Sequence, residues 1–507
     1  MYKFLRYCRI TLSLLFLIAI TLIFIDIYGN IASKFTALLK WQMVPSILGI
    51  ATESFAIITV LFVITLLFGR VYCSTLCPLG TFQDIVRRIA NLFKTKKQRS
   101  LAYAKPHNYW RYSILTLTVA LFIAGSSTLI LWLDPYSNYG RIVGNLFKPL
   151  VVLINNFFAN IRPTIPAFTM NEVTGTAVLT AIIISLVVIY LSAFRGRLWC
   201  NTICPVGSLL GIVSHYSIFR LNIDKNTCTN CTLCEKQCKS QCIDIKTQQI
   251  DSSRCVQCMD CMQVCKSNAI SHNYLFSKNV EKTTPVESND PSRRRLVISS
   301  LSALGVSAIY SIVGKPLRID APKNVKAIAP FGARSIARLK RHCTACHACI
   351  ASCPTKTIRP ALGEYGLDGV MLPVMDYDIS FCNYECTICS EVCPNGALIP
   401  LQVEEKKVTQ VGKAHFFRER CITVVNETDC GACDEHCPTK AVRMIPYKDR
   451  LRIPEIDLSL CIGCGGCEYI CPTRPRSIIV FGNSEHEIAK MPEIQVQEEI
   501  EVDGFGF

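Results

Sequence analysis

Thirty cysteines limit what this chain of 507 residues can fold into more than any other feature. Twenty-four of them form six groups of four with short, repeated spacings, unlike the irregular cysteines of small disulfide-bonded secreted domains. Four groups have the spacing C-x2-C-x2-C-x3-C: Cys228, Cys231, Cys234 and Cys238; Cys255, Cys258, Cys261 and Cys265; Cys343, Cys346, Cys349 and Cys353; Cys461, Cys464, Cys467 and Cys471. Two groups are variants: Cys382, Cys386, Cys389 and Cys393; Cys421, Cys430, Cys433 and Cys437. Three thiolates on one short loop and a fourth from elsewhere are the ligands of a [4Fe–4S] cluster, so the sequence predicts six clusters rather than zinc sites.

The first two groups lie within residues 221–275, which is the size of a two-cluster ferredoxin domain. In that fold the fourth cysteine of each run binds the other cluster, so Cys265 is expected with the first group and Cys238 with the second. The other four groups lie within 315–481, and each is followed by a proline. There we expect a nested exchange, in which the first group pairs with the fourth and the second with the third.

The stretch CTACH at 343–347 also matches the C-x-x-C-H signature of covalently bound haem. Cys349 and Cys353 continue the ferredoxin spacing, and no second C-x-x-C-H occurs. A cluster is therefore expected at this position.

Four apolar stretches before residue 200 predict membrane-spanning helices, at roughly 10–28, 46–68, 113–133 and 176–194. The mean hydropathy of the chain, +0.30, agrees with membrane segments. Much of the net charge of +16 lies in the segment 70–111, which contains nine Lys and Arg residues and a single acidic residue, Asp84. This distribution suits a cytoplasmic loop better than a nucleic-acid surface, so both ends of the four-helix domain 1–220 are expected in the cytoplasm.

The membrane domain contains an internal repeat, because FGRVYCSTLCPLG at 68–80 matches RGRLWCNTICPVG at 195–207. DIYGN at 26–30 and DPYSN at 134–138 match more loosely. Two helix pairs related by an axis along the membrane normal would bring four C-x3-C-P thiols together. They are Cys73, Cys77, Cys200 and Cys204. These thiols suit a seventh metal or cluster site or a reversible dithiol pair; the alternative is small packing residues, and we favour a functional role.

Three acidic residues near helix ends, Asp26, Glu53 and Asp134, are candidate proton acceptors for quinol oxidation. Simple placement at the membrane interface is the favoured interpretation of them.

The segment 276–291 is polar and is expected to be a linker. It is followed by SRRRL at 292–296 and a weakly apolar run, which is typical of a twin-arginine export signal over 292–314. An ordinary fifth membrane helix is the alternative, and either places 315–481 outside the cytoplasm. The acidic segment 482–507 is expected to be a tail.

The C-x3-C-P repeat with the ferredoxin domain 221–275 resembles the NapH family of membrane ferredoxins. The arginine-rich segment followed by four cluster groups resembles the exported ferredoxins of the NapG/MauM family, so the chain looks like a fusion of the two. The C-x3-C-P core is also similar to that of the NosR and CcoG families. The fold class expected is therefore an α-helical membrane domain plus α+β bacterial-type ferredoxin domains, with a signal or membrane helix between them.

The resemblance implies a protein of the cytoplasmic (inner) membrane that passes electrons from menaquinol or ubiquinol to a periplasmic oxidoreductase, as in periplasmic nitrate reduction, or to a c-type cytochrome. Six [4Fe–4S] clusters, with a bound quinone, would form the wire. No nucleophile–base pair is evident, so no catalytic residue is predicted. A hydrocarbon core of about 30 Å is too thick for one electron hop, so something must bridge it.

Two other functions fit the same motifs. One is an assembly factor that reduces a metal centre during the maturation of another enzyme. The other is a polyferredoxin hub with every cluster in the cytosol.

Overall fold

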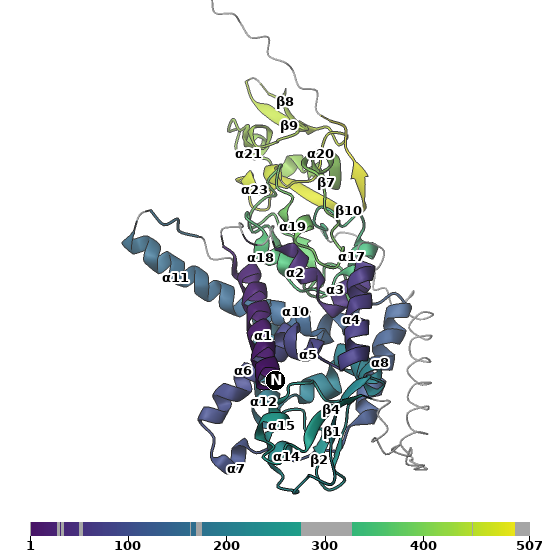
Figure 1. The fold of residues 1–507 in the computed structure, drawn as a ribbon. Helices are drawn as coiled ribbons and strands as arrows, with labels where there is room; N and C mark the ends of the chain where they lie inside the picture. The colour runs from purple at the N-terminus through teal and green to yellow at the C-terminus, as the bar shows by residue number, and fades with distance from the viewer. Residues whose placement is uncertain are drawn as a thin grey trace, which may run out of the picture.

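The computed structural model describes residues 2–27, 31, 35–49, 54–162, 164–168, 175–274, 327–448 and 450–491. A helical region lies between two smaller domains, which sit at its opposite ends (Figure 1). We call residues 219–274 the inner domain and residues 327–491 the outer domain. The predicted linker 276–291, the twin-arginine segment 292–314, Glu53 and residues 492–507 of the predicted tail lie outside the described residues.

The helical region holds four helices at the expected apolar stretches and several short ones. The former are α1 (Tyr2–Ile25), α4 (Ser54–Phe68), α8 (Asn108–Ile123) and α12 (Gly175–Arg195). The others are α2 (Thr36–Lys40), α3 (Met43–Leu48), α5 (Tyr72–Thr75), α6 (Pro78–Leu92), α7 (Lys96–Arg99), α9 (Thr128–Leu133), α10 (Pro135–Ile142), η1 (Val143–Phe147), α11 (Lys148–Ile161), η2 (Trp199–Ile203) and α13 (Pro205–His215). Pro78 and Pro205 occupy the first helical turns of α6 and α13, where proline is favoured because no N–H is needed there.

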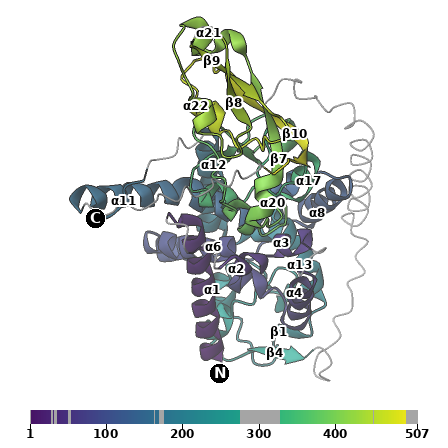
Figure 2. The ribbon, with the colours of Figure 1, turned by 90° about the horizontal axis from the view of Figure 1, so that it is seen from above.

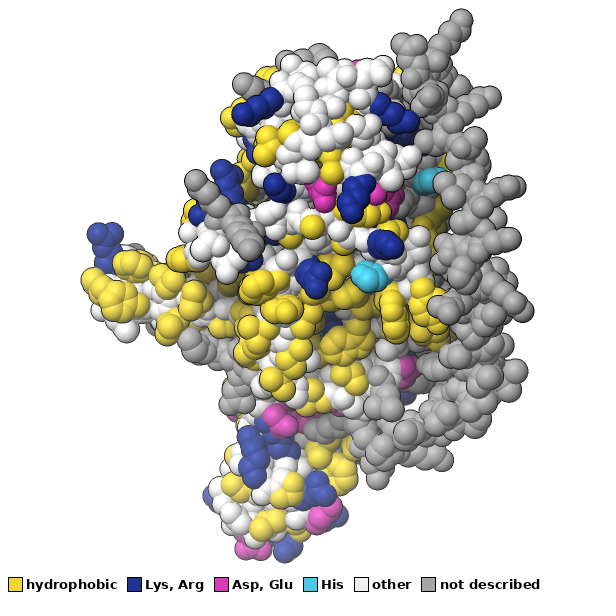
Figure 3. All heavy atoms as spheres, turned by 90° about the horizontal axis from the view of Figure 1, so that it is seen from below, with side chains coloured by type: hydrophobic (Ala, Val, Ile, Leu, Met, Phe, Trp, Pro, Cys, Tyr) yellow, Lys and Arg dark blue, Asp and Glu magenta, His cyan; other side chains and the backbone are white. Residues whose placement is uncertain are grey.

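Large apolar side chains are exposed along these helices. Leu15 and Ile18 of α1, Phe55 of α4 and Leu186 of α12 are each more than half exposed. In Figure 3 hydrophobic side chains gather over α11 and across the middle of the face shown. A soluble monomer rarely exposes so much contiguous apolar surface, so the helical region is a membrane region.

Among the described residues, three helices are long and apolar enough to span a bilayer, where the sequence predicted four spans: Phe4–Ile25, Pro135–Ile161 and Gly175–Arg195. The expected span 113–133 is broken between Ile123 and Thr128, where Gly125 adopts a φ of +89°. The segment 135–161, expected as a connection, is instead continuously helical. Its first part, α10, is fully buried, whereas α11 projects from the body crosswise to α1 (Figures 1 and 2).

The inner domain consists of two antiparallel strand pairs and two one-turn helices. β1 (Phe219–Ile223) pairs with β4 (Ile270–Tyr274), with Leu221 opposite His272, and β2 (Ile243–Asp244) pairs with β3 (Gln249–Ile250). The helices are α14 (Leu233–Gln237) and α15 (Asp260–Val264). This short-element architecture is that of a bacterial-type ferredoxin.

The outer domain has three antiparallel strand pairs: β5 (Ile358–Pro360) with β6 (Pro373–Met375), β7 (Thr409–Phe416) with β10 (Ile478–Ile488), and β8 (Val442–Pro446) with β9 (Arg452–Ile456). Between them lie α17 (Ile336–His342), α18 (Ala348–Ser352), η3 (Leu367–Gly369), α19 (Ile388–Glu391), α20 (Val403–Val408), η4 (Arg418–Arg420), α21 (Ile422–Val425), α22 (Ala432–Glu435) and α23 (Gly466–Ile470). Isolated two-stranded pairs are marginally stable and need additional contacts or cross-links. The cysteine groups lie among these pairs.

Candidate functional site

The four regular cysteine runs share one backbone conformation. In each run two residues adopt left-handed φ values, one just before the second cysteine and one just after it. These pairs are Asn230 (53°) and Thr232 (62°), Gln257 (52°) and Met259 (62°), Ala345 (49°) and His347 (65°), and Gly463 (76°) and Gly465 (83°). The loop therefore curls around its own thiols, and the Ala345 N–H donates to Cys343 Sγ at 3.3 Å.

The inner domain brings its eight group cysteines together in two sets. One cavity is lined by Cys238, Cys255, Cys258 and Cys261. Cys234 lies beside Cys231, Cys265 and Cys228. This is the exchange of fourth cysteines that the ferredoxin pattern predicts. Cys242 Sγ lies 3.6 Å from Cys238 Sγ, and this hydrogen bond lowers the pKa of Cys238.

The outer domain assembles four sets, and their pairing corrects the nested scheme. The sets are Cys343, Cys346, Cys349 and Cys393; Cys353, Cys382, Cys386 and Cys389; Cys421, Cys430, Cys433 and Cys471; Cys437, Cys461, Cys464 and Cys467. The first two runs exchange fourth cysteines with each other, as do the last two. Runs that are neighbours in sequence close shorter loops, which costs less chain entropy than nesting.

These sets suit [4Fe–4S] clusters. Among the described residues, no three Cys, His, Asp or Glu side chains are arranged to hold a single metal ion. Donors also reach individual sulfurs: the Leu398 N–H at 3.4 Å from Cys393 Sγ and the Lys406 ammonium at 3.4 Å from Cys382 Sγ. Hydrogen bonds of this kind tune cluster potentials.

The first outer set is docked directly on the helical region. His347 is buried and bridges Asn145 Nδ2 and the Met371 carbonyl, each at 3.2 Å, so it is an interface residue and its ring is committed to these contacts. The Lys148 ammonium donates to the Ala351 carbonyl. A Cβ at Gly140 would lie 2.6 Å from the Cys346 carbonyl oxygen, so this glycine lets α10 approach the cysteine loop.

The four C-x3-C-P cysteines are buried, with exposed fractions of 3–4%. Cys77 and Cys204 stand at the N-terminal ends of α6 and α13, and Cys204 Sγ accepts from the Gly207 N–H at 3.3 Å. Cys204 lies near Cys200, Cys77 and Cys73. The structure therefore assembles the thiols of both motifs in one place.

Two buried arginines connect the motifs crosswise. Arg70, from the first motif, donates to the Cys200 carbonyl at 3.0 Å and to Cys73 Sγ at 3.7 Å. Arg197, from the second, donates to the Cys73 carbonyl. The glycine in each C-P-x-G leaves space for these carbonyl–arginine hydrogen bonds. A Cβ at Gly80 would lie 2.4 Å from the Cys73 carbonyl oxygen, and a Cβ at Gly207 would lie 2.0 Å from the Cys200 carbonyl oxygen. Both arginines belong to the sequence repeat, but the repeat alone does not indicate their role.

Asp84 connects this site to the inner domain. Its carboxylate accepts from Arg197 at 2.7 and 2.9 Å and from Lys239 at 2.6 Å. Burial alone would raise the pKa of Asp84, but the two cations outweigh it and hold that pKa well below its usual range. Lys239 also reaches Asp260 at 3.3 Å, and Asp260 pairs with Arg6 of α1 at 2.8 Å.

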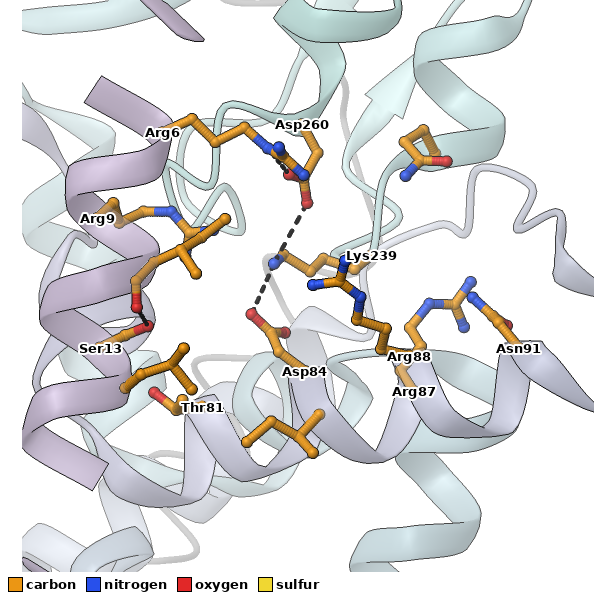
Figure 4. Close-up of a pocket in the computed structure, with 14 residues that line it drawn as sticks. Arg6, Arg9, Ser13, Thr81, Asp84, Arg87, Arg88, Asn91, Lys239 and Asp260 are labelled. Atoms are coloured by element: carbon orange, nitrogen blue, oxygen red, sulfur yellow. Dashed lines mark hydrogen bonds and ion pairs between the residues drawn. The ribbon is translucent and has the colours of Figure 1, made fainter. Parts of the chain in front are cut away.

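A cavity of about 330 Å³ lies at this junction of α1, α6 and the inner domain (Figure 4). Its polar lining includes Arg6, Arg9, Ser13, Thr81, Asp84, Arg87, Arg88, Asn91, Gln237, Lys239 and Asp260. Ile10 and Leu14 of the membrane helix α1 and Ile85 of α6 supply apolar lining. Lys239 and Asp260 lie near Cys258, so the cavity borders the set formed by Cys238, Cys255, Cys258 and Cys261.

One continuous hydrophobic core joins the cysteine sets at both ends. It contains Val256 of the inner domain, the C-x3-C-P cysteines, Tyr72, Tyr136 and Tyr139 of the helical region, and Cys346 and Ala348 of the outer domain. Cys258 and Cys349 pack against it.

The acidic candidates have structural contacts. The Asp134 carboxylate accepts from the Ser137 N–H at 2.9 Å and hydroxyl at 2.6 Å, which caps α10. The Asp26 carboxylate accepts from the Ile31 N–H at 2.8 Å. These contacts favour placement at helix ends over proton transfer.

Comparisons with known proteins identify iron–sulfur domains along the chain. A profile described as a 4Fe-4S binding domain matches twice, at 50–100 and 177–226, and both matches include a C-x3-C-P motif. Two profiles described as 4Fe-4S dicluster domains match 342–398 and 428–474, and another 4Fe-4S binding domain matches 249–271. No solved structure matches.

Three curated relatives illustrate the similarity. An uncharacterized protein of Methanocaldococcus jannaschii, MJ0749, is 33% identical over 36% of this chain and 58% of its own. YccM of Escherichia coli, named as an electron transport protein, is 27% identical over 40% of this chain and 51% of its own. MauM of Methylorubrum extorquens, a methylamine utilization ferredoxin-type protein, is 30% identical over 34% of this chain and 81% of its own. The chain thus spans little more than half the length of the first two relatives.

Proposed function

Because the chain belongs to the family of ferredoxin-type proteins that includes MauM, we propose that it carries electrons from membrane quinol to an acceptor outside the cytoplasm. Its membrane helices and 4Fe-4S domains make it a membrane-associated iron–sulfur electron-transport protein. The proposal adds the donor, the acceptor and the direction. In it the chain is a fusion of a NapH-like and a NapG/MauM-like part, and the acceptor is a periplasmic oxidoreductase of the nitrate reductase type or a c-type cytochrome.

The observation that carries this proposal is the continuous core between the two ends of the molecule. The inner and outer domains, which contain the cysteine sets, lie at opposite ends of the helical region (Figure 1). The exterior of that region is apolar. A soluble hub would have no need for such an arrangement. In the proposal the inner domain is cytoplasmic, the outer domain is exoplasmic, and the segment 292–314 is the export signal or membrane helix between them.

Six [4Fe–4S] clusters are the cofactors that the proposal requires. The six sets of cysteines found in the inner and outer domains would hold them, with fourth cysteines exchanged between neighbouring runs. Clusters accept one electron at a time, so the two electrons of a quinol enter the chain in turn.

The cavity of Figure 4 is the place we propose for the quinol ring. It lies where membrane helices meet the inner domain, and Leu14 forms part of its apolar lining. Polar side chains on its other walls can bind the two ring oxygens. An electron released there has the nearby set of Cys238, Cys255, Cys258 and Cys261 as its first acceptor.

The test uses the full-length protein with its clusters, in membranes or detergent. Leu14→Trp adds bulk to the apolar lining of the cavity, and Leu15→Trp, at the adjacent exposed position, is the matched control. Overpacking costs about 1–3 kcal/mol, so we expect reduction of the clusters by duroquinol to slow roughly tenfold or more in Leu14→Trp alone. Reduction by dithionite should be unchanged in both. Equal rates with quinol in the two variants would refute this site.

Sidedness is tested separately with a reporter fused after Phe507. A reporter that is active only outside the cytoplasm is expected, and a reporter active only inside would overturn the two-sided arrangement. A deletion strain also separates electron delivery from maturation: under the proposal the partner enzyme is fully metallated but receives no electrons from quinol.

A further inference from the structure

We propose that Cys73, Cys77, Cys200 and Cys204 together hold one redox-active [4Fe–4S] cluster, a seventh centre between the inner and outer domains. The two motifs each contribute two thiolates, so neither motif forms the site alone. The proposal goes beyond the function above, which needs six clusters and a donor. It does not require that the donor be quinol.

The first argument is the unpaired polar groups that surround the thiols. Arg70 is fully buried, no carboxylate among the described residues pairs with it, and its Nε has no partner. Gln83 is 1% exposed and lies 3.5 Å from Cys200 Sγ through its side-chain oxygen, while its amide nitrogen has no partner. Buried donors are normally satisfied, so an acceptor is missing here. The sulfides and thiolates of a cluster are such acceptors.

The second argument is charge. A buried cation needs a compensating anion, because desolvation of an unpaired ion is costly. Asp84 compensates Arg197 on one side of the site. Within the part of the chain that the structure describes, the partners of Arg70 are two carbonyls, an amide oxygen and a thiol. A cluster with four thiolate ligands carries net negative charge and compensates Arg70.

The third argument is the local backbone. Cys77 and Cys204 directly precede Pro78 and Pro205 at the starts of α6 and α13. The Gly207 N–H already points at Cys204 Sγ. Equivalent residues of the two motifs thus present equivalent ligands.

The position of the site fits a relay. Arg70 also donates to the Ser253 carbonyl, two residues before Cys255 of the inner domain. On the other side, Tyr72 and Tyr136 continue the core towards Cys346. An electron from the inner set that contains Cys255 would reduce the [4Fe–4S]²⁺ core to the 1+ state and would then pass to the outer set that contains Cys346. No bond forms or breaks in this step, and no proton moves.

The experiment measures iron, acid-labile sulfide and Mössbauer spectra in the purified full-length protein. Cys73→Ser and Cys200→Ser remove one ligand from each motif, and Cys8→Ser, an exposed thiol of α1 outside every set, is the control. Each ligand variant should lose about one seventh of the iron and sulfide, in equal amounts, and the double variant should lose no more. The control should lose none.

Three results would overturn the proposal. They are unchanged iron in both ligand variants, zinc or copper replacing iron at this site, and a reversible disulfide among the four thiols without iron. If the cysteine variants fail to fold, Arg70→Gln keeps every ligand while removing the adjacent positive charge. One cluster should then be harder to reduce in a redox titration followed by EPR, with Arg70→Lys close to wild type. No change in any potential would count against the site. These readouts are independent of quinol, so they are separate from the Leu14→Trp test.

Discussion

At the scale of single residues, Asp84 holds the inner domain to the membrane helices. It is the partner of two cations, Arg197 at 1% and Lys239 at 10% side-chain exposure. Removing the shared anion leaves the buried Arg197 without a carboxylate and leaves Lys239 with Asp260 alone. We expect Asp84→Asn to lower the free energy of unfolding by about 3 kcal/mol, near the lower end for buried pairs because Asp84 is partly exposed.

Protease resistance and thermal unfolding of the cluster-loaded protein measure this effect. The control is Glu427→Gln, which breaks an exposed pair with Lys448 and should cost less than about 1 kcal/mol. The pKa of Asp84 is lower in the folded protein than in the unfolded chain, so this stabilisation is present at neutral pH. It is lost only as pH falls below about 4, the unfolded value. A loss of stability near pH 6 that depends on Asp84 would contradict this assignment.

Residue types predicted part of this site. The cysteines were recognisable because a cluster needs thiolates at short fixed spacings, and Asp84 stood out as the one acid among nine cations between Arg70 and Arg111. The roles of Arg70 and Gln83 were not predictable, because they depend on which segments meet across the two motifs. The repeated G-R before each C-x3-C-P was the available signal.

At the scale of elements, the left-handed residues of the cysteine loops decide which substitutions a loop tolerates. Thr232, Met259 and His347 occupy the position that Gly465 occupies in the last run, so a side chain is compatible with that backbone. At Gly465, however, a Cβ would lie 2.2 Å from the Tyr377 ring. We expect Gly465→Ala to destabilise this loop by about 1–3 kcal/mol through overpacking and to lower the occupancy of its cluster.

Gly431 provides the matched comparison. It lies between Cys430 and Cys433, has an ordinary φ of −127°, and a Cβ there would meet nothing closer than 3.9 Å. Gly431→Ala should therefore leave iron content and EPR signals unchanged. Equal losses in the two variants would show that the Tyr377 contact is not what matters.

The outer domain should also depend on its clusters for its fold. Its described strands form only two-stranded pairs, which are marginal on their own, and its core includes the cysteines Cys437, Cys461 and Cys467. Removal of iron by a chelator under reducing conditions should make residues 327–491 sensitive to protease in one cooperative step. The long helices α1 and α12 should persist by circular dichroism. A protease-resistant outer domain without iron would disprove this dependence.

Element prediction failed where tertiary packing overrides apolar composition. The stretch 113–133 is mostly apolar, yet the chain turns at Gly125, and α9 packs towards the outer domain, where Ser127 donates to the Lys340 carbonyl at 2.5 Å. The sequence predicts a connection at 135–161, although this segment is apolar enough to span a bilayer and its first part, α10, is fully buried. Hydropathy reports the composition of a segment and not the partner that covers it.

At the scale of the whole molecule, we expect the contact between α10 and the first outer cysteine loop to determine whether electrons pass from the inner domain to the outer domain. Gly140 lies where a Cβ would come within 2.6 Å of both the Cys346 carbonyl oxygen and the Phe24 ring. Gly140→Ala must therefore displace α10, α1 or the loop. Overpacking of this kind costs about 1–3 kcal/mol. Here we expect the overlap to be relieved by a shift of the outer domain away from the helices.

We expect Gly140→Ala to slow electron transfer from the inner sets to the outer sets while every cluster stays loaded. The measurement is the rate at which clusters of the outer domain are reduced after the inner domain is reduced, resolved by rapid-freeze EPR in reconstituted vesicles. Gly144→Ala, one turn further along the same continuous helix, has nothing within 4 Å of the added Cβ and should behave as wild type. If both variants transfer electrons at the wild-type rate, electrons reach the outer domain by another route, and the core through Tyr136 and Cys346 is only a structural joint.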